Sequence, residues 1–102
     1  MNTFHAEIFA GHRVAALFFG RLDVSEDSLT VRARPAWMLR PITASRDTIR
    51  HVLVRHTRYV EVITIDDTNG IFAGINVNVL VMAYGKVRRQ LDACGYAVVD
   101  RP

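Results

Sequence analysis

The fold is decided by the stretch LVMAYGKVRRQLDACGY, residues 80–96. Its apolar residues are spaced four, three, four and three positions apart, as on one face of an α-helix: Leu80, Tyr84, Val87, Leu91 and Cys94. Gly95 follows where a left-handed residue ends many helices, and we expect Tyr96 to fold back on the last turn. The sequence therefore predicts a C-terminal helix over about residues 79–94, with Asn78 as its N-terminal cap.

Most of the chain before this helix alternates apolar and polar residues, as β-strands do. Residues 22–33 are predicted to form a hairpin, because turn-forming residues at 25–28 separate two alternating segments. Residues 59–65 are almost all strand formers. The turn signal at Asn69 and Gly70 predicts a partner strand that begins at Ile71. We also expect a short final strand at residues 97–99.

Three segments keep alternatives open. Residues 4–10 suit a strand, whereas the apolar run at residues 14–19 fits a buried strand or a short helix. Pro35 and Pro41 bracket a segment that is typical of a loop or an edge strand. Residues 45–48 fit a turn or a single helical turn before the next strand.

Length and composition predict one domain over residues 1–102. A chain of 102 residues, half of them hydrophobic, can build one core but not two. The predicted fold class is α+β: a strongly bent antiparallel sheet or partial barrel, closed at one end by the C-terminal helix. The single cysteine, Cys94, excludes an intramolecular disulfide, and we expect it to be buried on the helix.

The sequence also bears on location and on the class of partner. The most apolar stretch, residues 71–84, is shorter than the roughly 20 residues that span a bilayer. No signal peptide is recognisable, so we expect a cytoplasmic protein. The formal net charge of +3 is too small to demand a nucleic-acid partner. Twelve of the thirteen basic residues are arginine, which indicates either anion recognition or a bias of the coding genome.

One charge cluster is a candidate ligand site, and it lies within residues 46–58. It contains the arginines Arg46, Arg50, Arg55 and Arg58, with two histidines and a single acidic residue between them. Such a cluster can hold a phosphate head group or an acidic peptide, although a solvated strand face and loop is the simpler explanation. Arg50 and Arg55 have opposite strand parity, so only a bulge or a turn would bring them to one face.

No residue pattern commits the chain to catalysis, a metal or a cofactor. The four histidines are His5, His12, His51 and His56, and their spacing predicts no convergent set of metal ligands. The adjacent carboxylates at 26–27 and at 66–67 lie in predicted turns, where solvated turn chemistry explains them. We therefore expect no catalytic residue, no metal and no cofactor.

The start of the helix predicts contact with another surface. Residues 79–84 are apolar all the way round, whereas a helix on a barrel shows one wet face. Either the N-terminal segment covers them, or a second subunit does. The predicted interface residues are Phe18, Phe19, Val81 and Met82.

The order of elements resembles that of the bacterial pleckstrin-homology-like domains. Residues 22–31 are similar to the opening hairpin of that family, and the apolar residues at 42–54 to its next strand. Residues 60–64 with the turn at 69–70 resemble a later hairpin, and residues 91–96 the end of a closing helix. The resemblance covers about residues 20–96. It implies a non-catalytic module that binds protein, peptide or lipid head group and often self-associates.

The favoured function is a cytoplasmic binding or assembly module that recognises a protein, a peptide or an anionic head group and forms a homo-oligomer. One alternative is a small enzyme whose site is completed at a subunit interface. A deep pocket that gathers a histidine and a carboxylate would distinguish that enzyme from a binding module. The other alternative is a weak nucleic-acid-binding protein.

Overall fold

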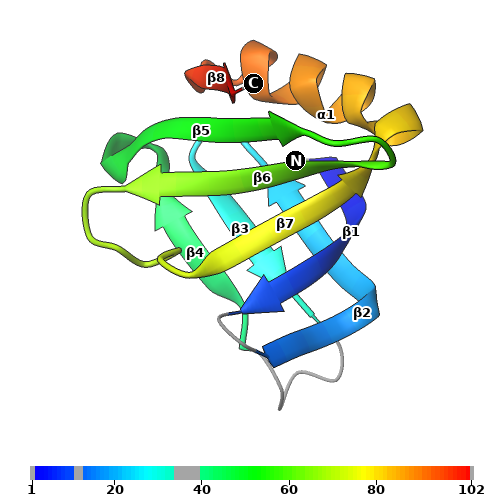
Figure 1. The fold of residues 1–102 in the computed structure, drawn as a ribbon. Coiled ribbons are helices and arrows are strands. Elements are labelled where there is room, and N and C mark those ends of the chain that lie inside the picture. Colours follow the sequence, from blue (N-terminus) through cyan, green and yellow to red (C-terminus); the bar gives the residue numbers. More distant parts are fainter. Residues whose placement is uncertain (1, 11–12, 34–39, 102) are drawn as a thin grey trace.

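The strands of the protein form one curled sheet in the order β4-β3-β2-β1-β7-β6-β5-β8. The computed structural model describes residues 2–10, 13–33 and 40–101. Figure 1 shows the sheet wrapping into a half-barrel, with the helix across one end. The strands are β1 (Asn2–Ala10), β2 (Arg13–Val24), β3 (Ser28–Arg32), β4 (Ile42–Ser45), β5 (Ile49–His56), β6 (Val60–Asp67), β7 (Ile75–Leu80) and β8 (Val98–Arg101).

Two antiparallel meanders build the sheet, β1–β4 and β5–β7, and pairing between β1 and β7 joins them. The predicted α+β class, with a partial barrel and a C-terminal helix, is therefore confirmed. One pair departs from the predicted antiparallel sheet, because β8 runs parallel to β5. A parallel neighbour needs a crossover connection, and the helix α1 (Val81–Ala93) lies in the chain between β5 and β8.

The core fills the inner side of the curled sheet. In β6, buried residues alternate with half-exposed ones along the whole strand, as expected for a strand with one face inward. The largest fully buried side chains come from both meanders and from the helix: Ile8, Leu22, Leu29, Ile63, Phe72 and Leu91. Helix α1 buries Val87 and Leu91 against this core, so the predicted apolar face of the helix is confirmed in its second half.

The helix starts two residues later than its predicted start at 79, because β7 continues to Leu80 and pairs there with Val60. Asn78 lies in β7, so its predicted role as the helix cap is wrong. Leu80 occupies the cap position without a side-chain hydrogen bond and is 58% exposed. The strand ladder holds Asn78 in extended backbone, which removes it from the helix start.

The end of the helix follows the prediction. Gly95 has a φ of 83°. The N–H of Tyr96 donates to the carbonyl of Leu91, and that of Gly95 to the carbonyl of Asp92, each at 3.0 Å. These two bonds satisfy carbonyls that the last helical turn leaves free. Burial raises the pKa of Tyr96 to about 12, and its hydroxyl donates to the carbonyl of Ser25 at 2.8 Å.

The connection after β6 is longer than the predicted tight turn. Gly70 and Gly74 have φ values of 67° and 77°, and residues 71–72 belong to this loop rather than to a strand. The buried carboxylate of Asp67 organises the loop by accepting three backbone N–H groups, from Asn69, Ile71 and Phe72. Phe72 is 1% exposed, so the loop folds inward to bury a ring instead of returning at once as a strand.

The remaining segments resolve most of the open alternatives. Residues 14–19 lie in β2, and the hairpin at 22–33 is formed by β2 and β3. Residues 46–48 form a single 3-10 turn, η1 (Arg46–Thr48), before β5. The loop or edge strand predicted between Pro35 and Pro41 falls almost wholly outside the described residues. Within the described ranges, no helix combines the length and the apolarity needed to cross a membrane.

We predict that Leu91→Ala lowers the free energy of unfolding by about 2–5 kcal/mol, because it leaves a cavity where the helix meets the core. Chemical denaturation measures this loss. Arg89→Ala, at an exposed position of the same helix, is the matched control and should change stability little. Equal stability of the Leu91 variant and the wild type would contradict the assigned packing.

We predict that Asp67→Asn lowers the free energy of unfolding by about 1–3 kcal/mol at neutral pH. Burial alone would raise the pKa of Asp67, but the backbone hydrogen bonds outweigh it and hold the pKa below its usual value. A lowered folded-state pKa stabilises above the unfolded pKa of about 3.9, and this stability is lost as the pH falls below it.

The difference between wild type and Asp67→Asn should therefore shrink below about pH 4. Denaturation at neutral and at acidic pH measures it, with the exposed Asp47→Asn as the control. A difference that grows on acidification would refute the role of the Asp67 carboxylate.

Candidate functional site

The four arginines predicted as a ligand site have different neighbours in the structure. Arg46, in η1, lies against Gly95, where an added Cβ would collide with its guanidinium. Arg50 pairs with Asp66 at 3.0 Å. The guanidinium of Arg58 lies over the ring of Tyr59, 5.4 Å from its centroid. Arg55 lines a hollow on the sheet. The structure therefore does not gather the four at one point.

The register of β5 explains where Arg50 lies. The pairing of β5 with β6 shifts between Ile49 and His51, so Arg50 is the extra residue of a bulge. His51 and Arg50 both contact the carboxylate of Asp66, at 3.3 Å and 3.0 Å. In a regular strand, Arg50 and Arg55 would point to opposite faces. A bulge can thus bring Arg50 toward the face that carries Arg55. Asp66 nevertheless neutralises Arg50 there.

The hollow beside Arg55 lies on the outer face of the sheet and has a volume of about 140 Å³. Its lining comes from β5, β6, β7 and β8: Leu53, Arg55, Val62, Thr64, Asn76 and Arg101. The lining residues of β5, β6 and β7 alternate along their strands with core residues, so the hollow and the core are on opposite faces of the sheet. We call this hollow the outer groove.

Two arginines from neighbouring strands line the outer groove. Arg55 and Arg101 are direct partners in the parallel ladder of β5 and β8. Ion pairs in the described part of the chain involve Arg32, Arg50 and Arg88, but neither Arg55 nor Arg101. Like charges directly opposite each other destabilise a sheet, so these two leave an uncompensated positive site.

Polar groups and an apolar floor complete the outer groove. The hydroxyl of Thr64 donates to the side-chain oxygen of Asn76 at 3.0 Å, which fixes the Asn76 amide and leaves its NH₂ group as a donor. Leu53 and Val62 supply the apolar surface between them. Guanidinium and amide donors together suit an acceptor-only anion such as phosphate, sulfate or carboxylate.

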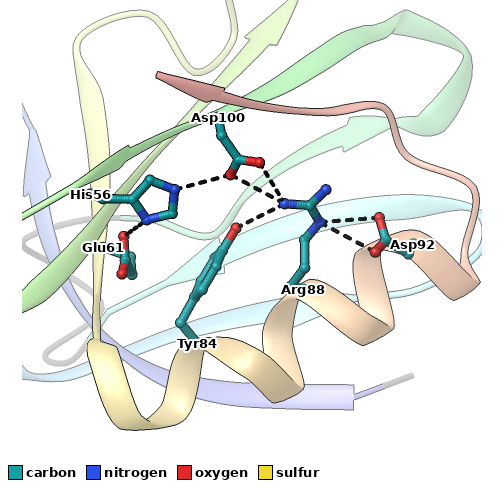
Figure 2. A network of polar contacts seen from close by, with 6 residues as sticks. All are labelled: His56, Glu61, Tyr84, Arg88, Asp92 and Asp100. Atoms are coloured by element: carbon teal, nitrogen blue, oxygen red, sulfur yellow. Dashed lines mark hydrogen bonds and ion pairs between the residues drawn. The ribbon is translucent and has the colours of Figure 1, made fainter. Parts of the chain in front are cut away.

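A second polar cluster lies on the inner face, at the end of the barrel that the helix covers. Figure 2 shows His56 of β5 between two carboxylates, Glu61 of β6 and Asp100 of β8. The Nδ1 of His56 pairs with Glu61, and its Nε2 lies 3.1 Å from Asp100. Arg88 of α1 contacts Asp100 at 3.0 Å and Asp92 at 3.2 Å. We call the set of His56, Glu61, Asp100 and Arg88 the clasp.

Within the clasp, electrostatics favour the charged forms of Asp100 and Arg88. The Arg88 guanidinium holds the pKa of Asp100 below its usual value. Hydrogen bonds to Tyr84 and Asp100 raise the pKa of Arg88 further. Tyr84 packs edge-on against the ring of His56, and burial raises the pKa of its hydroxyl. Glu61 is 8% exposed, whereas His56 and Asp100 are about half exposed at 46% and 45%.

The clasp contains the histidine and the carboxylates that an enzyme would need, but their polar atoms already engage one another. Both ring nitrogens of His56 face carboxylates, and both oxygens of Asp100 bond Arg88. The outer groove lies on the opposite face of the sheet. The arrangement therefore ties β5, β6, β8 and α1 together.

Of the predicted interface residues, Val81 and Met82 are 44% and 90% exposed. Tyr59 is 70% exposed as well, and its carbonyl accepts the N–H of Val81 at 3.1 Å. With Leu80 these residues form an apolar corner patch, where the β5–β6 turn meets the helix start (Figure 1). The side chains of Phe18 and Phe19 lie outside the described residues, although their backbone belongs to β2.

Sequence reasoning missed Arg101, Glu61, Asp100 and Arg88 as site residues. Glu61 could have been found, because the hairpin around residues 57–59 puts it opposite His56. Arg101 and Asp100 gave no signal, since nothing in the sequence predicts which strand β8 joins. As for metals, the described residues contain no group of three potential ligands among His, Cys, Asp and Glu.

No known protein-family model matches this chain, and a search of curated proteins finds no relative.

Proposed function

We propose that this protein is a non-catalytic binding module that holds an anionic group, of the phosphate or sulfate type, in the outer groove. The observation that carries the proposal is the pair Arg55 and Arg101, which lie side by side without an acidic partner in the described residues. A bound oxyanion would accept hydrogen bonds from both guanidinium groups and remove their repulsion. Arg55 was among the predicted ligand residues, and Arg101 joins it from the last strand.

The size of the outer groove supports a single small group as the ligand. Pockets that enclose drug-sized molecules have volumes of about 300–1,000 Å³. The outer groove, at about 140 Å³, is smaller and open on the surface of the sheet. It suits one charged group that a larger molecule presents, such as the head group of an anionic lipid or a soluble organic phosphate.

The order of elements supports a module of the pleckstrin-homology-like type. The hairpin β2–β3, the segments β4 and β5 on either side of the turn η1, the antiparallel pair β6–β7 and the closing helix α1 follow one another in the order on which the resemblance rests. That resemblance implies binding without catalysis. The clasp agrees with it, since both ring nitrogens of His56 face carboxylates and both oxygens of Asp100 accept hydrogen bonds from Arg88.

We predict that Arg55→Gln/Arg101→Gln weakens the binding of inositol hexakisphosphate at least about tenfold, because charge-assisted hydrogen bonds are lost. Isothermal titration calorimetry measures the affinity. Arg50→Gln/Arg58→Gln is the matched control, since it removes the same charge from the same strand and its following turn. The control should lose much less than the groove variant.

Equal loss in the two double variants would mean unspecific charge attraction and would refute the outer groove as a site. Negligible binding by the wild type would refute the proposal itself. Vesicles of phosphatidylcholine with an added anionic lipid identify the source of the group. Co-sedimentation with these vesicles, abolished by the groove variant, would indicate a lipid head group, and binding of the soluble phosphate alone a free ligand.

A second copy of the chain is the proposed occupant of the corner patch. Four large apolar side chains are exposed together there, at a helix start that no side chain caps. We predict that the wild type self-associates and that Met82→Glu shifts it toward the monomer. Sedimentation velocity measures the state, with Ile71→Glu, at an exposed apolar position in the 68–74 loop, as control. A wild-type monomer at high micromolar concentration would contradict self-association.

A further inference from the structure

The outer groove depends on β8, which is a four-residue strand at the edge of the sheet. Its parallel ladder with β5 runs from the Val52–Val98 pair to the Arg55–Arg101 pair. The first of its residues is half-buried and the other three are exposed, so packing against the core contributes little to holding β8. Side-chain contacts must therefore supply part of the attachment.

The clasp supplies that attachment, and it adjoins the outer groove through the backbone. Asp100 of the clasp is the neighbour of Arg101, and His56 is the neighbour of Arg55. Successive residues of a strand point to opposite faces, so the clasp and the groove use the two faces of the same two strands. Figure 2 shows Asp100 held from two sides, by His56 and by Arg88.

The clasp is complete only when His56 carries a proton on each ring nitrogen. Nδ1 faces Glu61 and Nε2 faces Asp100. A neutral imidazole donates from one nitrogen and presents a lone pair at the other, which a carboxylate oxygen repels. The other groups that face His56 come from α1, where Tyr84 packs on the ring and Arg88 is bound to Asp100.

Because Glu61 is buried, it depends strongly on the proton that His56 Nδ1 donates to it. The described residues contain three buried carboxylates, Asp23, Glu61 and Asp67. Asp23 bonds Arg32 and Thr3, and Asp67 bonds backbone N–H groups, so the partners of both are independent of pH near neutrality. The ion pair of Glu61 in the structure is with a histidine, the side chain that changes charge between about pH 5 and 8.

We infer that His56 is a positioning residue for the outer groove, and that its protonation strengthens anion binding there by keeping β8 docked with Arg101 beside Arg55. This inference rests on the proposed function and adds its regulation. When His56 loses its proton, Glu61 retains the one remaining donor, since it is the more buried carboxylate and suffers most when unpaired. The bond to Asp100 is then lost, and β8 is held by Arg88 and the backbone ladder alone.

The test measures the affinity for inorganic sulfate, whose charge is constant between about pH 5 and 8. Nuclear magnetic resonance titrations of the wild type, His56→Gln and His51→Gln give the affinity at both ends of this range. The wild type should bind sulfate at least about fivefold more tightly near pH 5 than near pH 8. His56→Gln should lose most of that ratio. His51→Gln removes the same titrating charge from the outer face of β5 and should keep it.

The inference would be overturned if the ratio of the two affinities persisted in His56→Gln, or if it disappeared in His51→Gln. Either result would indicate direct charge attraction instead. Wild-type binding that is equal at both ends would overturn it while leaving the proposed function intact. No wild-type binding of sulfate at either pH would overturn both.

A second measurement keeps the inference testable if His56→Gln fails to fold. Because coupling between two sites is reciprocal, saturating sulfate must move the titration midpoint of the wild-type His56 ring to higher pH. Direct attraction would move the midpoint of His51 at least as much, since His51 shares the face of the groove. A shift of His51 that equals or exceeds that of His56 would overturn the role of the clasp.

Discussion

The parallel pairing of β8 with β5 is the interaction on which both polar clusters depend. It brings Asp100 to the inner face and Arg101 to the outer face, and no other strand supplies either group. The pairing requires the chain to reverse within four residues after the helix. Gly95, with its φ of 83°, makes that reversal, and the buried ring of Tyr96 fixes it to the β2–β3 turn. The way in which α1 ends thus determines the geometry of both the clasp and the outer groove.

The arginines fall into two groups: those that pair with a carboxylate of the fold and those that can bind another anion. Arg32 and Arg88 neutralise carboxylates that the sheet or the helix has partly buried. Arg50 is compensated by Asp66 on the surface. Arg55 and Arg101 differ from these, because each has an arginine and not a carboxylate as its neighbour in the ladder. Both line the outer groove. Abundance of arginine in the composition therefore carries little information, whereas the pairing of each arginine carries much.

Local patterns in the sequence predicted most of the strands and the helix. Contacts between distant residues decided where some of these elements begin and end. The spacing of Val87 and Leu91 and the cap at Gly95 depend on neighbouring residues, so the helix and its end could be predicted. The helix start could not, because the ladder extends β7 to Leu80 against the local preference. The strand expected at Ile71 failed for a related reason, since Asp67 and the burial of Phe72 hold that segment in a loop.

The site was less predictable than the fold because its residues lie far apart in the chain. Four arginines close in sequence suggested one cluster, but a bulge, a turn and a 3-10 segment give them different surroundings. Only Arg55 lines the outer groove, and its partner Arg101 is 46 residues away in the numbering. Such a pair becomes visible only when the strand order is known.

The energetics of β8 explain how a small charge change can reach the outer groove. Repulsion between directly opposed like charges and attraction within exposed ion pairs are each worth about 0.2–1 kcal/mol. The repulsion between Arg55 and Arg101 on one face and the contacts of Asp100 on the other are thus of similar size. Beyond the backbone ladder with β5, the side-chain contributions to the attachment of this edge strand are therefore small and nearly balanced. If the outer groove holds an anion between the two arginines, that anion and a proton on His56 would act on this one balance in the same direction.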